Sequence, residues 1–124
     1  MRTKFSDDAA GREKYLLTIA ADSIAATVYE YTYRVIYGSQ LAAVRDLNSS
    51  GTVDKDKLKS YFDTAKSLYP AMYETDNFER WLQWLIKAAY LVEERDGDSV
   101  QISEMGRDFL QFVITRGYAF NKTG

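Results

Sequence analysis

The stretch FERWLQWLIKAAYLVEERDGDSVQISEMGRDFLQFV, residues 78–113, decides the fold of this chain. Its first part spaces apolar side chains three and four positions apart, which predicts a helix with one buried face. The pair Asp96-Gly97 then separates two short runs, and an Asp-Gly pair in that setting is the strongest local signal of a β-hairpin. Ser103 can cap a following helix, because its hydroxyl can accept a hydrogen bond from a free backbone N–H. The stretch therefore predicts a helix, a hairpin and a second helix, in that order.

The predicted hairpin and the helix before it each have an inward and an outward side. Side chains alternate along a strand, so we expect Val92, Val100 and Ile102 to point inward. The expected buried stripe of the helix consists of Phe78, Trp81, Leu82, Leu85, Ile86 and Ala89. Trp84 lies well off that stripe, since each residue advances a helix by about 100°. Trp84 is therefore an outward aromatic side chain.

Two further helices are predicted upstream. Apolar residues from Leu58 to Leu68 lie at helical spacing, and Pro70 ends that run because proline cannot continue a helix. A long helix is predicted over residues 12–47, which contain no proline and a single glycine, Gly38. This glycine marks a bend or a close crossing with another helix.

The first half of the predicted long helix carries a heptad-like apolar seam. The seam consists of Leu17, Ala21, Ile24, Val28, Tyr31 and Val35. Other faces of this half are apolar as well, and such a helix has to be covered on more than one side. One small domain can hardly do this alone. We therefore expect the helix to mediate a homodimer or to bind a partner helix.

Tyrosines concentrate next to this seam, in YEYTYRVIY, residues 29–37. Tyr31 lies on the seam, whereas Tyr29 and Tyr33 share another face. Tyrosine suits protein interfaces, where the ring is buried and the hydroxyl finds water or a partner. Burial in the chain's own core and stacking on bases are the alternatives. The predicted interface comprises Leu17, Ile24, Val28, Tyr29, Tyr31, Tyr33 and Val35, with Trp84 as a flanking anchor.

Residues 54–116 resemble a winged helix-turn-helix domain. The resemblance lies in YLVE (90–93), which leads into the hairpin, and in ISEMGRDFL (102–110), which fits the pattern I-S-x-x-G-R-x-F-L. It implies a mostly α fold with three helices, a β-hairpin wing and a C-terminal helix. From the chain length we expect a single domain of residues 1–124, in which the long N-terminal helix of residues 12–47 precedes this unit. It does not imply one function, because winged helices serve both DNA binding and protein assembly.

The charges bear on the choice between these two functions. The formal net charge is −2, whereas a free-standing nucleic-acid binder is usually basic. The hairpin tip, residues 93–98, carries four acidic side chains and one arginine, which is unfavourable for phosphate contact. The side chains available for DNA contact are Arg80, Gln83, Lys87 and Arg95. A non-enzymatic interaction or regulatory module is therefore the first hypothesis, and a dimeric DNA-binding transcriptional regulator is the alternative.

Residues 46–57, DLNSSGTVDKDK, imitate a calcium-binding loop. Asp46, Asn48 and Ser50 occupy its first, third and fifth positions. The twelfth position needs a bidentate glutamate, and here it is Lys57, whose ammonium repels the ion. We therefore interpret the segment as an interhelical loop followed by a capped helix.

The composition argues against catalysis and against a membrane protein. The chain has no cysteine and no histidine, which removes thiolate metal sites, disulfides and histidine-based catalysis. No glycine-rich phosphate loop or nucleophile motif is present. We expect no enzyme activity, no cofactor, no metal and no evident small-molecule substrate. The most apolar window is too short and too polar to span a bilayer, so we expect a cytoplasmic protein. The tail, residues 121–124, is expected to be loose.

Overall fold

The computed structural model describes residues 24–124 in two parts. Residues 24–35 are helical and belong to a unit, Met1–Val35, that is separate from the compact unit Ile36–Gly124. The prediction of a helix over residues 12–23, and with it the seam positions Leu17 and Ala21, lies outside the described residues.

The helix predicted to run to residue 47 is interrupted at residues 36 and 37. A new helix, α2 (Gly38–Ser50), begins after Tyr37, whose backbone is extended with φ −74° and ψ 148°. The Gln40 side chain reaches back to accept a hydrogen bond from the Tyr37 N–H at 3.0 Å, as the last residue of a capping box does. Gly38 therefore begins a helix and does not bend one.

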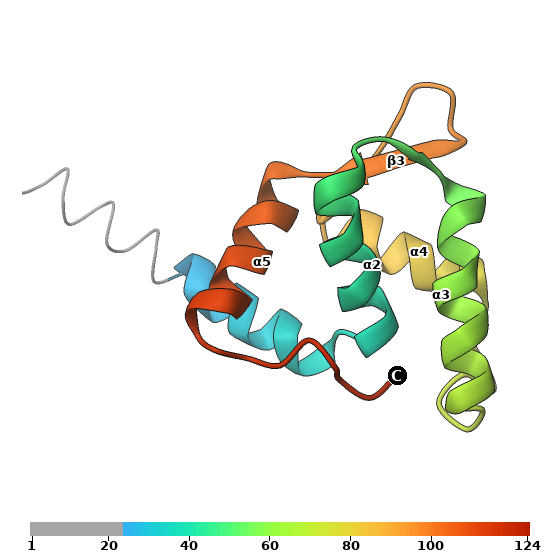
Figure 1. Ribbon diagram of the computed structural model, residues 1–124, viewed down its shortest axis with the longest axis horizontal. Coiled ribbons are helices and arrows are strands. Elements are labelled where there is room, and N and C mark those ends of the chain that lie inside the picture. The colour runs from blue at the N-terminus through green and yellow to red at the C-terminus, as the bar shows by residue number, and fades with distance from the viewer. Residues whose placement is uncertain (1–23) are drawn as a thin grey trace, which may run out of the picture. The chain divides into compact units, whose positions relative to one another are not determined.

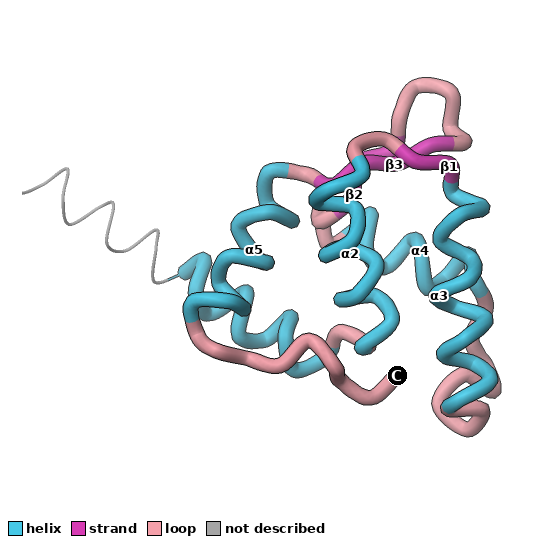
Figure 2. Tube along the Cα trace, viewed as in Figure 1, coloured by secondary structure: helices cyan, strands magenta, loops and turns pink. Residues whose placement is uncertain are grey.

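The compact unit contains four helices and a small sheet, in the order α2, β1 (Val53–Asp54), α3 (Lys55–Leu68), α4 (Phe78–Lys87), β2 (Leu91–Glu93), β3 (Ser99–Ile102), α5 (Glu104–Thr115) (Figure 1). The sheet is antiparallel with strand order β1-β3-β2 (Figure 2). The helices and the hairpin predicted for residues 54–116 are present, so the fold is mostly α. The two-residue strand β1, which pairs Val53 with Val100, has no sequence signal.

Helix α2 provides much of the core. It lies between α3 and α5 in Figure 1, and the Leu41 and Val44 side chains are fully buried. Aromatic rings fill the space beside it: the centroids of Phe62 and Tyr73 lie 5.4 Å apart, edge to face. This geometry is favourable for aromatic pairs. The rest of the buried aromatic set is Trp81, Tyr90 and Phe109.

The inward side of the hairpin differs from the prediction at one position. Val100 and Ile102 are buried, as predicted, but Val92 is 45% exposed and Leu91 is buried in its place. The cause lies at the end of α4, where Ala89 has a left-handed backbone with φ 69°. The N–H of Ala89 donates to Ile86 O and that of Tyr90 donates to Leu85 O, which together form a Schellman motif. This turn shifts the alternation of inward and outward side chains along β2 by one residue from the predicted pattern.

The prediction of a loose tail is also wrong, because residues 122–124 are hydrogen-bonded to the start of α2 and the residues just before it. The N–H groups of Gly38 and Ser39 donate to Thr123 O at 3.2 Å and to Gly124 O at 3.0 Å. The first N–H groups of a helix have no partner within the helix, so the tail supplies the acceptors. A Cβ on Gly38 would lie 2.0 Å from Lys122 O, so only glycine allows this approach.

A buried hydroxyl reinforces the same junction. The Tyr73 hydroxyl donates to Gly124 O at 2.9 Å and shares a hydrogen bond of 2.9 Å with Ser39 Oγ. Burial raises the pKa of Tyr73, so the phenol stays protonated and keeps its ability to donate. The Trp81 indole N–H also donates to Ser39 Oγ, at 3.0 Å. The tail, α2 and α4 therefore meet in one hydrogen-bonded cluster.

Candidate binding surface on α4 and the hairpin

Helix α4 positions the predicted contact residues of the compact unit. Asn77 caps its start, because the Asn77 side chain accepts a hydrogen bond from the Arg80 N–H at 2.8 Å. The helix buries Trp81, Leu82 and Leu85 of the predicted stripe, and Phe78 and Ile86 are half-buried. The predicted burial of Ala89 is wrong: this residue lies beyond the end of α4, in the turn, and is exposed. Arg80, Gln83, Trp84 and Lys87 are then left on the opposite side by their spacing. Arg80 and Lys87 are exposed, and Gln83 and Trp84 are half-buried.

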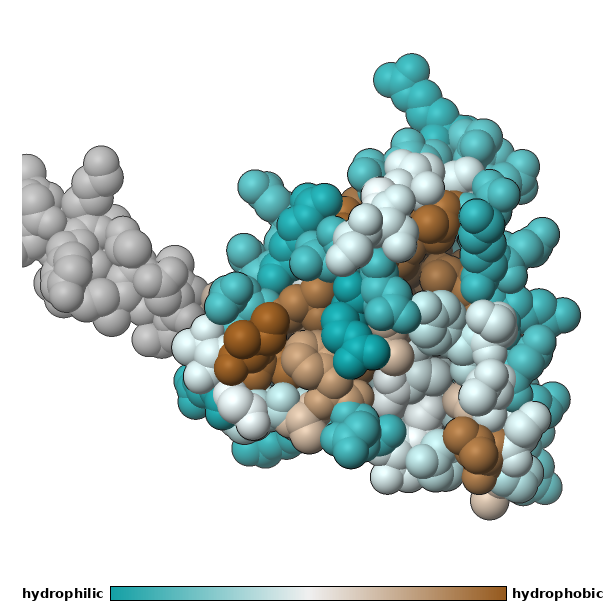
Figure 3. Space-filling model, in the orientation of Figure 1, coloured by the Kyte–Doolittle hydropathy of each residue, from teal (hydrophilic) through white to brown (hydrophobic). Residues whose placement is uncertain are grey.

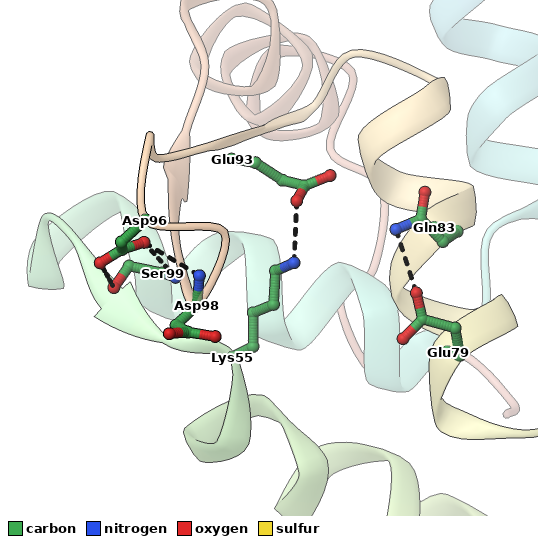
Figure 4. Close-up of polar contacts among 7 residues, drawn as sticks. All are labelled: Lys55, Glu79, Gln83, Glu93, Asp96, Asp98 and Ser99. Carbon is green, nitrogen blue, oxygen red and sulfur yellow. Dashed lines mark hydrogen bonds and ion pairs between the residues drawn. The ribbon is translucent and has the colours of Figure 1, made fainter.

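Two of these four side chains are engaged within the chain. Arg80 Nη1 donates to Thr75 O at 2.8 Å. Gln83 Nε2 donates to Glu79 Oε1 at 3.2 Å, as Figure 4 shows. The second bond also places a carboxylate beside Gln83. A DNA strand would have to compete with these partners, so the basic footprint of α4 is weaker than its side chains suggest.

The hairpin tip is acidic, but one of its carboxylates is paired. Lys55 Nζ at the start of α3 lies 2.8 Å from Glu93 Oε2. Figure 4 shows the lysine reaching towards the hairpin from α3. No local signal in the sequence links Lys55 to residue 93, because the pairing depends on the turn between the strands. The pair is partly exposed, so its contribution to stability is small.

Asp96 holds the tip in shape and stays charged. Its Oδ1 accepts hydrogen bonds from the N–H of Asp98 at 2.9 Å and of Ser99 at 3.1 Å, and its Oδ2 accepts from Ser99 Oγ at 3.2 Å. Figure 4 shows Asp96 and Ser99 facing each other across the turn. The hydrogen bond from the Asp98 N–H, followed by those from Ser99, lowers the pKa of Asp96. Arg95 is exposed at this tip. The tip therefore presents a fixed negative charge next to a single arginine.

The other candidate surface is the apolar row of helix 24–35. Ile24 is 67% exposed and Tyr31 is 67% exposed. Val28 is 42% exposed and Val35 is 41% exposed. Such exposure of four large apolar side chains in one row is unusual. Tyr29 and Tyr33, on another face, are half-buried. Trp84 belongs to the compact unit, so its predicted place beside this row stays a prediction.

The predicted interhelical loop is reduced to Gly51 and Thr52, and the prediction that a capped helix follows is wrong, because the Asp54 side chain makes no capping hydrogen bond at the start of α3. Residues 46–50 are the last residues of α2, and Asp54 lies in β1. The Asp46 carboxylate accepts a hydrogen bond from the Tyr61 hydroxyl of α3. Burial and this hydrogen bond raise the pKa of Tyr61 to about 12. Within residues 24–124, no group of acidic side chains is arranged to hold a metal ion.

Comparisons with protein-family models, with curated proteins and with solved structures find no match to this chain. Among the described residues, none of the helices is long and apolar enough to cross a membrane.

Proposed function

We propose that this chain is a non-enzymatic interaction module of the winged-helix type, which self-associates through helix 24–35 and acts through protein contacts. The observed order helix, strand, helix, helix, hairpin, helix is the order expected of a winged helix. The pairing of β1 with the outer side of β3 also supports the class. The hairpin between residues 93 and 99 is then the wing, and α4 follows α3 as the second helix of the helix-turn-helix.

The exposed row of helix 24–35 is the observation that carries the proposed self-association. Its members are spaced four, three and four residues apart, so they form one continuous stripe. Isolated exposed apolar residues are ordinary, but a contiguous stripe of large ones indicates a docking surface. The same spacing allows two such stripes to interlock side by side, so a second copy of the chain is a fitting partner.

The test is the oligomeric state. Static light scattering is expected to give a dimer for the parent chain, and Tyr31→Asp is expected to weaken association about 100-fold, because each copy loses a buried ring. Arg34→Ala is the matched control, since Arg34 is exposed on the same helix outside the stripe. A parent chain that stays monomeric at high micromolar concentration would refute the proposed self-association. Equal dimerisation of the parent and Tyr31→Asp would do so as well.

DNA binding is the second candidate, and the element order favours it. In a winged helix the second helix of the helix-turn-helix enters the major groove, and here α4 carries Arg80, Gln83 and Lys87 on its outer side. The acidic tip with Arg95 opposes it, because its net charge repels phosphate. Duplex DNA should be tested at low salt, where electrostatic attraction is greatest, with Lys87→Ala compared with Lys66→Ala on α3. Salt-sensitive binding that the first variant weakens and the second does not would favour DNA over protein contacts.

A further inference from the structure

An open pocket lies between α2, α3 and the C-terminal tail, all of which belong to the compact unit. Its volume is ≈ 360 Å³, which is in the range of pockets that hold small organic molecules. In Figure 3 the surface between α2 and the lower half of α3 is mostly white to pale, whereas the hairpin tip is teal. The pocket is therefore neither strongly polar nor a simple apolar patch.

The helices that line the pocket combine small apolar groups with tyrosine rings. Ala42 of α2 and Ala65 of α3 present methyl groups where longer side chains would fill the space. The rings of Tyr61 and Tyr69, both half-buried, also line the pocket. Aromatic rings attract one another in offset or edge-to-face arrangements. Open space beside two such rings therefore suits a flat aromatic ligand.

Hydroxyl groups of α3 on the same lining can orient a ligand. Ser60 and Thr64 lie one helical turn apart and both line the pocket. Ser60 Oγ donates to Lys57 O at 3.2 Å, which leaves its lone pairs as acceptors. Thr64 is exposed, and a threonine hydroxyl can both donate and accept a hydrogen bond. A ligand with a hydroxyl of its own can therefore bond to this wall in either sense.

The charges of the lining favour a neutral ligand. The lining contains no acidic side chain, so a cationic ligand finds no counter-charge. Its basic side chain, Lys122, donates to Ile36 O at 3.0 Å. A neutral molecule leaves that contact as it is, and it loses less hydration than an ion does on entering a pocket with apolar walls.

The tail forms one side of the pocket, so the pocket is complete only while the tail is seated on α2. Gly124 lines the pocket together with Ser39 at the start of α2. Gly124 O accepts hydrogen bonds from the Ser39 N–H at 3.0 Å and from the Tyr73 hydroxyl at 2.9 Å. A ligand that binds only this arrangement stabilises it by mass action. Occupancy of the pocket is therefore coupled to the seating of the tail.

We propose that this pocket binds a small neutral aromatic molecule with a hydroxyl group, and that the bound molecule holds the tail on α2. The ring lies beside Ala42 and the two tyrosine rings, and its hydroxyl bonds to Thr64. This inference concerns the compact unit alone. It does not depend on the proposed self-association or on DNA binding.

The probe is phenol, which is neutral at pH 7. A ligand of about seven non-hydrogen atoms is expected to bind with a dissociation constant on the order of 1 mM. Cyclohexanol lacks the flat ring, whereas benzoate and benzylammonium keep the ring and add a charge of either sign. Each should bind about 3-fold or more weakly than phenol, because it loses ring contacts or hydration. Amide chemical shifts of Ala42, Thr64 and Ala65 report binding at this pocket.

Hydrogen exchange measures the coupling to the tail. The amides of Gly38 and Ser39 have their acceptors in the tail, so they exchange when the tail detaches. At about 10 mM phenol, ten times the expected dissociation constant, their exchange should slow about 10-fold. The Asp98 amide at the hairpin tip is the internal control, and its exchange should not change.

Two variants with a matched control place the binding in this pocket. Ala42→Leu fills the space beside α2 and should abolish saturable binding of phenol up to about 10 mM. Ser49→Leu adds the same side chain at an exposed position of α2 outside the lining, so it should leave binding unchanged. Thr64→Val removes the hydroxyl from an exposed position and should weaken binding about 5-fold. Because Thr64 is outside the core, this variant provides the test even if Ala42→Leu does not fold.

Saturable shifts that both variants diminish, together with slower exchange of the two amides of α2, would support the proposal. It is overturned if phenol gives no saturable shift at the three reporter amides up to about 10 mM. Undiminished binding by Ala42→Leu or by Thr64→Val would refute it too. Binding of benzoate or benzylammonium as tight as that of phenol would refute the neutral class of ligand. Saturable shifts without slower exchange would refute the coupling to the tail.

Discussion

The ends of α4 and α5 offer a matched test of backbone strain within one molecule. Both helices end in a Schellman motif, in which the residue after the C-cap has a left-handed backbone: Ala89 with φ 69° and Gly117 with φ 69°. At α5 the motif has the same two hydrogen bonds, from Gly117 N to Ile114 O and from Tyr118 N to Val113 O. The backbone geometry is thus matched, but one site has alanine where the other has glycine.

Ala89→Gly is therefore expected to stabilise the protein, and Gly117→Ala to destabilise it. The left-handed conformation costs an L-residue about 1–2 kcal/mol. A glycine also makes the unfolded chain more flexible, which lowers the free energy of unfolding by about 0.4–1 kcal/mol. The net change in the free energy of unfolding is therefore about 1 kcal/mol, a gain for Ala89→Gly and a loss for Gly117→Ala. Sterics add nothing at residue 117, because a Cβ there would meet no atom within 4 Å. Ala89 is exposed, so its methyl group contributes little packing.

Thermal and urea unfolding followed by circular dichroism measure both changes. A change of about 1 kcal/mol corresponds to a Tm shift of about 4–8 °C for a unit of this size. Ala88→Gly is the control, since Ala88 has an ordinary right-handed helical backbone with φ −73°. Loss of its methyl group should lower the free energy of unfolding by about 1 kcal/mol. We therefore expect stability changes of opposite sign at two neighbouring residues: a loss for Ala88→Gly and a gain for Ala89→Gly. If Ala89→Gly is as destabilising as Ala88→Gly, the assignment of strain to residue 89 is refuted.

Three further predictions concern the tail, Tyr61 and the hairpin tip. Gly38→Ala should destabilise the protein by about 1–2 kcal/mol, because the clash with Lys122 outweighs the gain in helix propensity. In a chain that lacks residues 119–124 the same substitution should no longer destabilise the protein, and urea unfolding measures both effects. The pKa of Tyr61 is raised to about 12, so the stability it contributes is complete below pH 10 and is lost as the pH rises from 10 to 12; Tyr61→Phe should remove this part of the alkaline stability loss in pH-dependent unfolding. The pKa of Asp96 is lowered, so its contribution is present at neutral pH and is lost as the pH falls below its ordinary value of 3.8; carboxyl titration by NMR would contradict this if Asp96 titrated at or above that value.

Much of the compact unit could be predicted from its local chemistry. Asp96-Gly97 produces a hairpin wherever two short strands flank it, and Ser103 caps α5 by accepting a hydrogen bond from the Gly106 N–H at 2.9 Å. The periodicity of residues 78–86 identified the buried face of α4, since packing against one core rewards a single stripe. These features depend on residues close together in the sequence.

Most of the features that could not be predicted depend on distant residues. The tail that packs against Gly38 comes from the other end of the chain, so no residue near this glycine indicates the contact. Strand β1 exists because Val100 is there to pair with Val53. The phase of β2 depends on an alanine adopting a conformation that sequence statistics reserve for glycine or asparagine. The candidate site was affected in the same way, since Lys55 enters it only through the fold.

The closure of α2 by the tail has a consequence for the order of folding. The contact of Lys122 with Ile36 joins residues 86 positions apart, and closing so long a loop costs entropy before any bond rewards it. The amides in the first turn of α2 should therefore become protected from hydrogen exchange late in folding, after the hairpin and α5 have formed. The amides of Gly38 and Ser39 are the reporters of this step, because their acceptors lie in the tail. In hydrogen exchange at native conditions, these two amides are expected to open together and independently of the rest of α2.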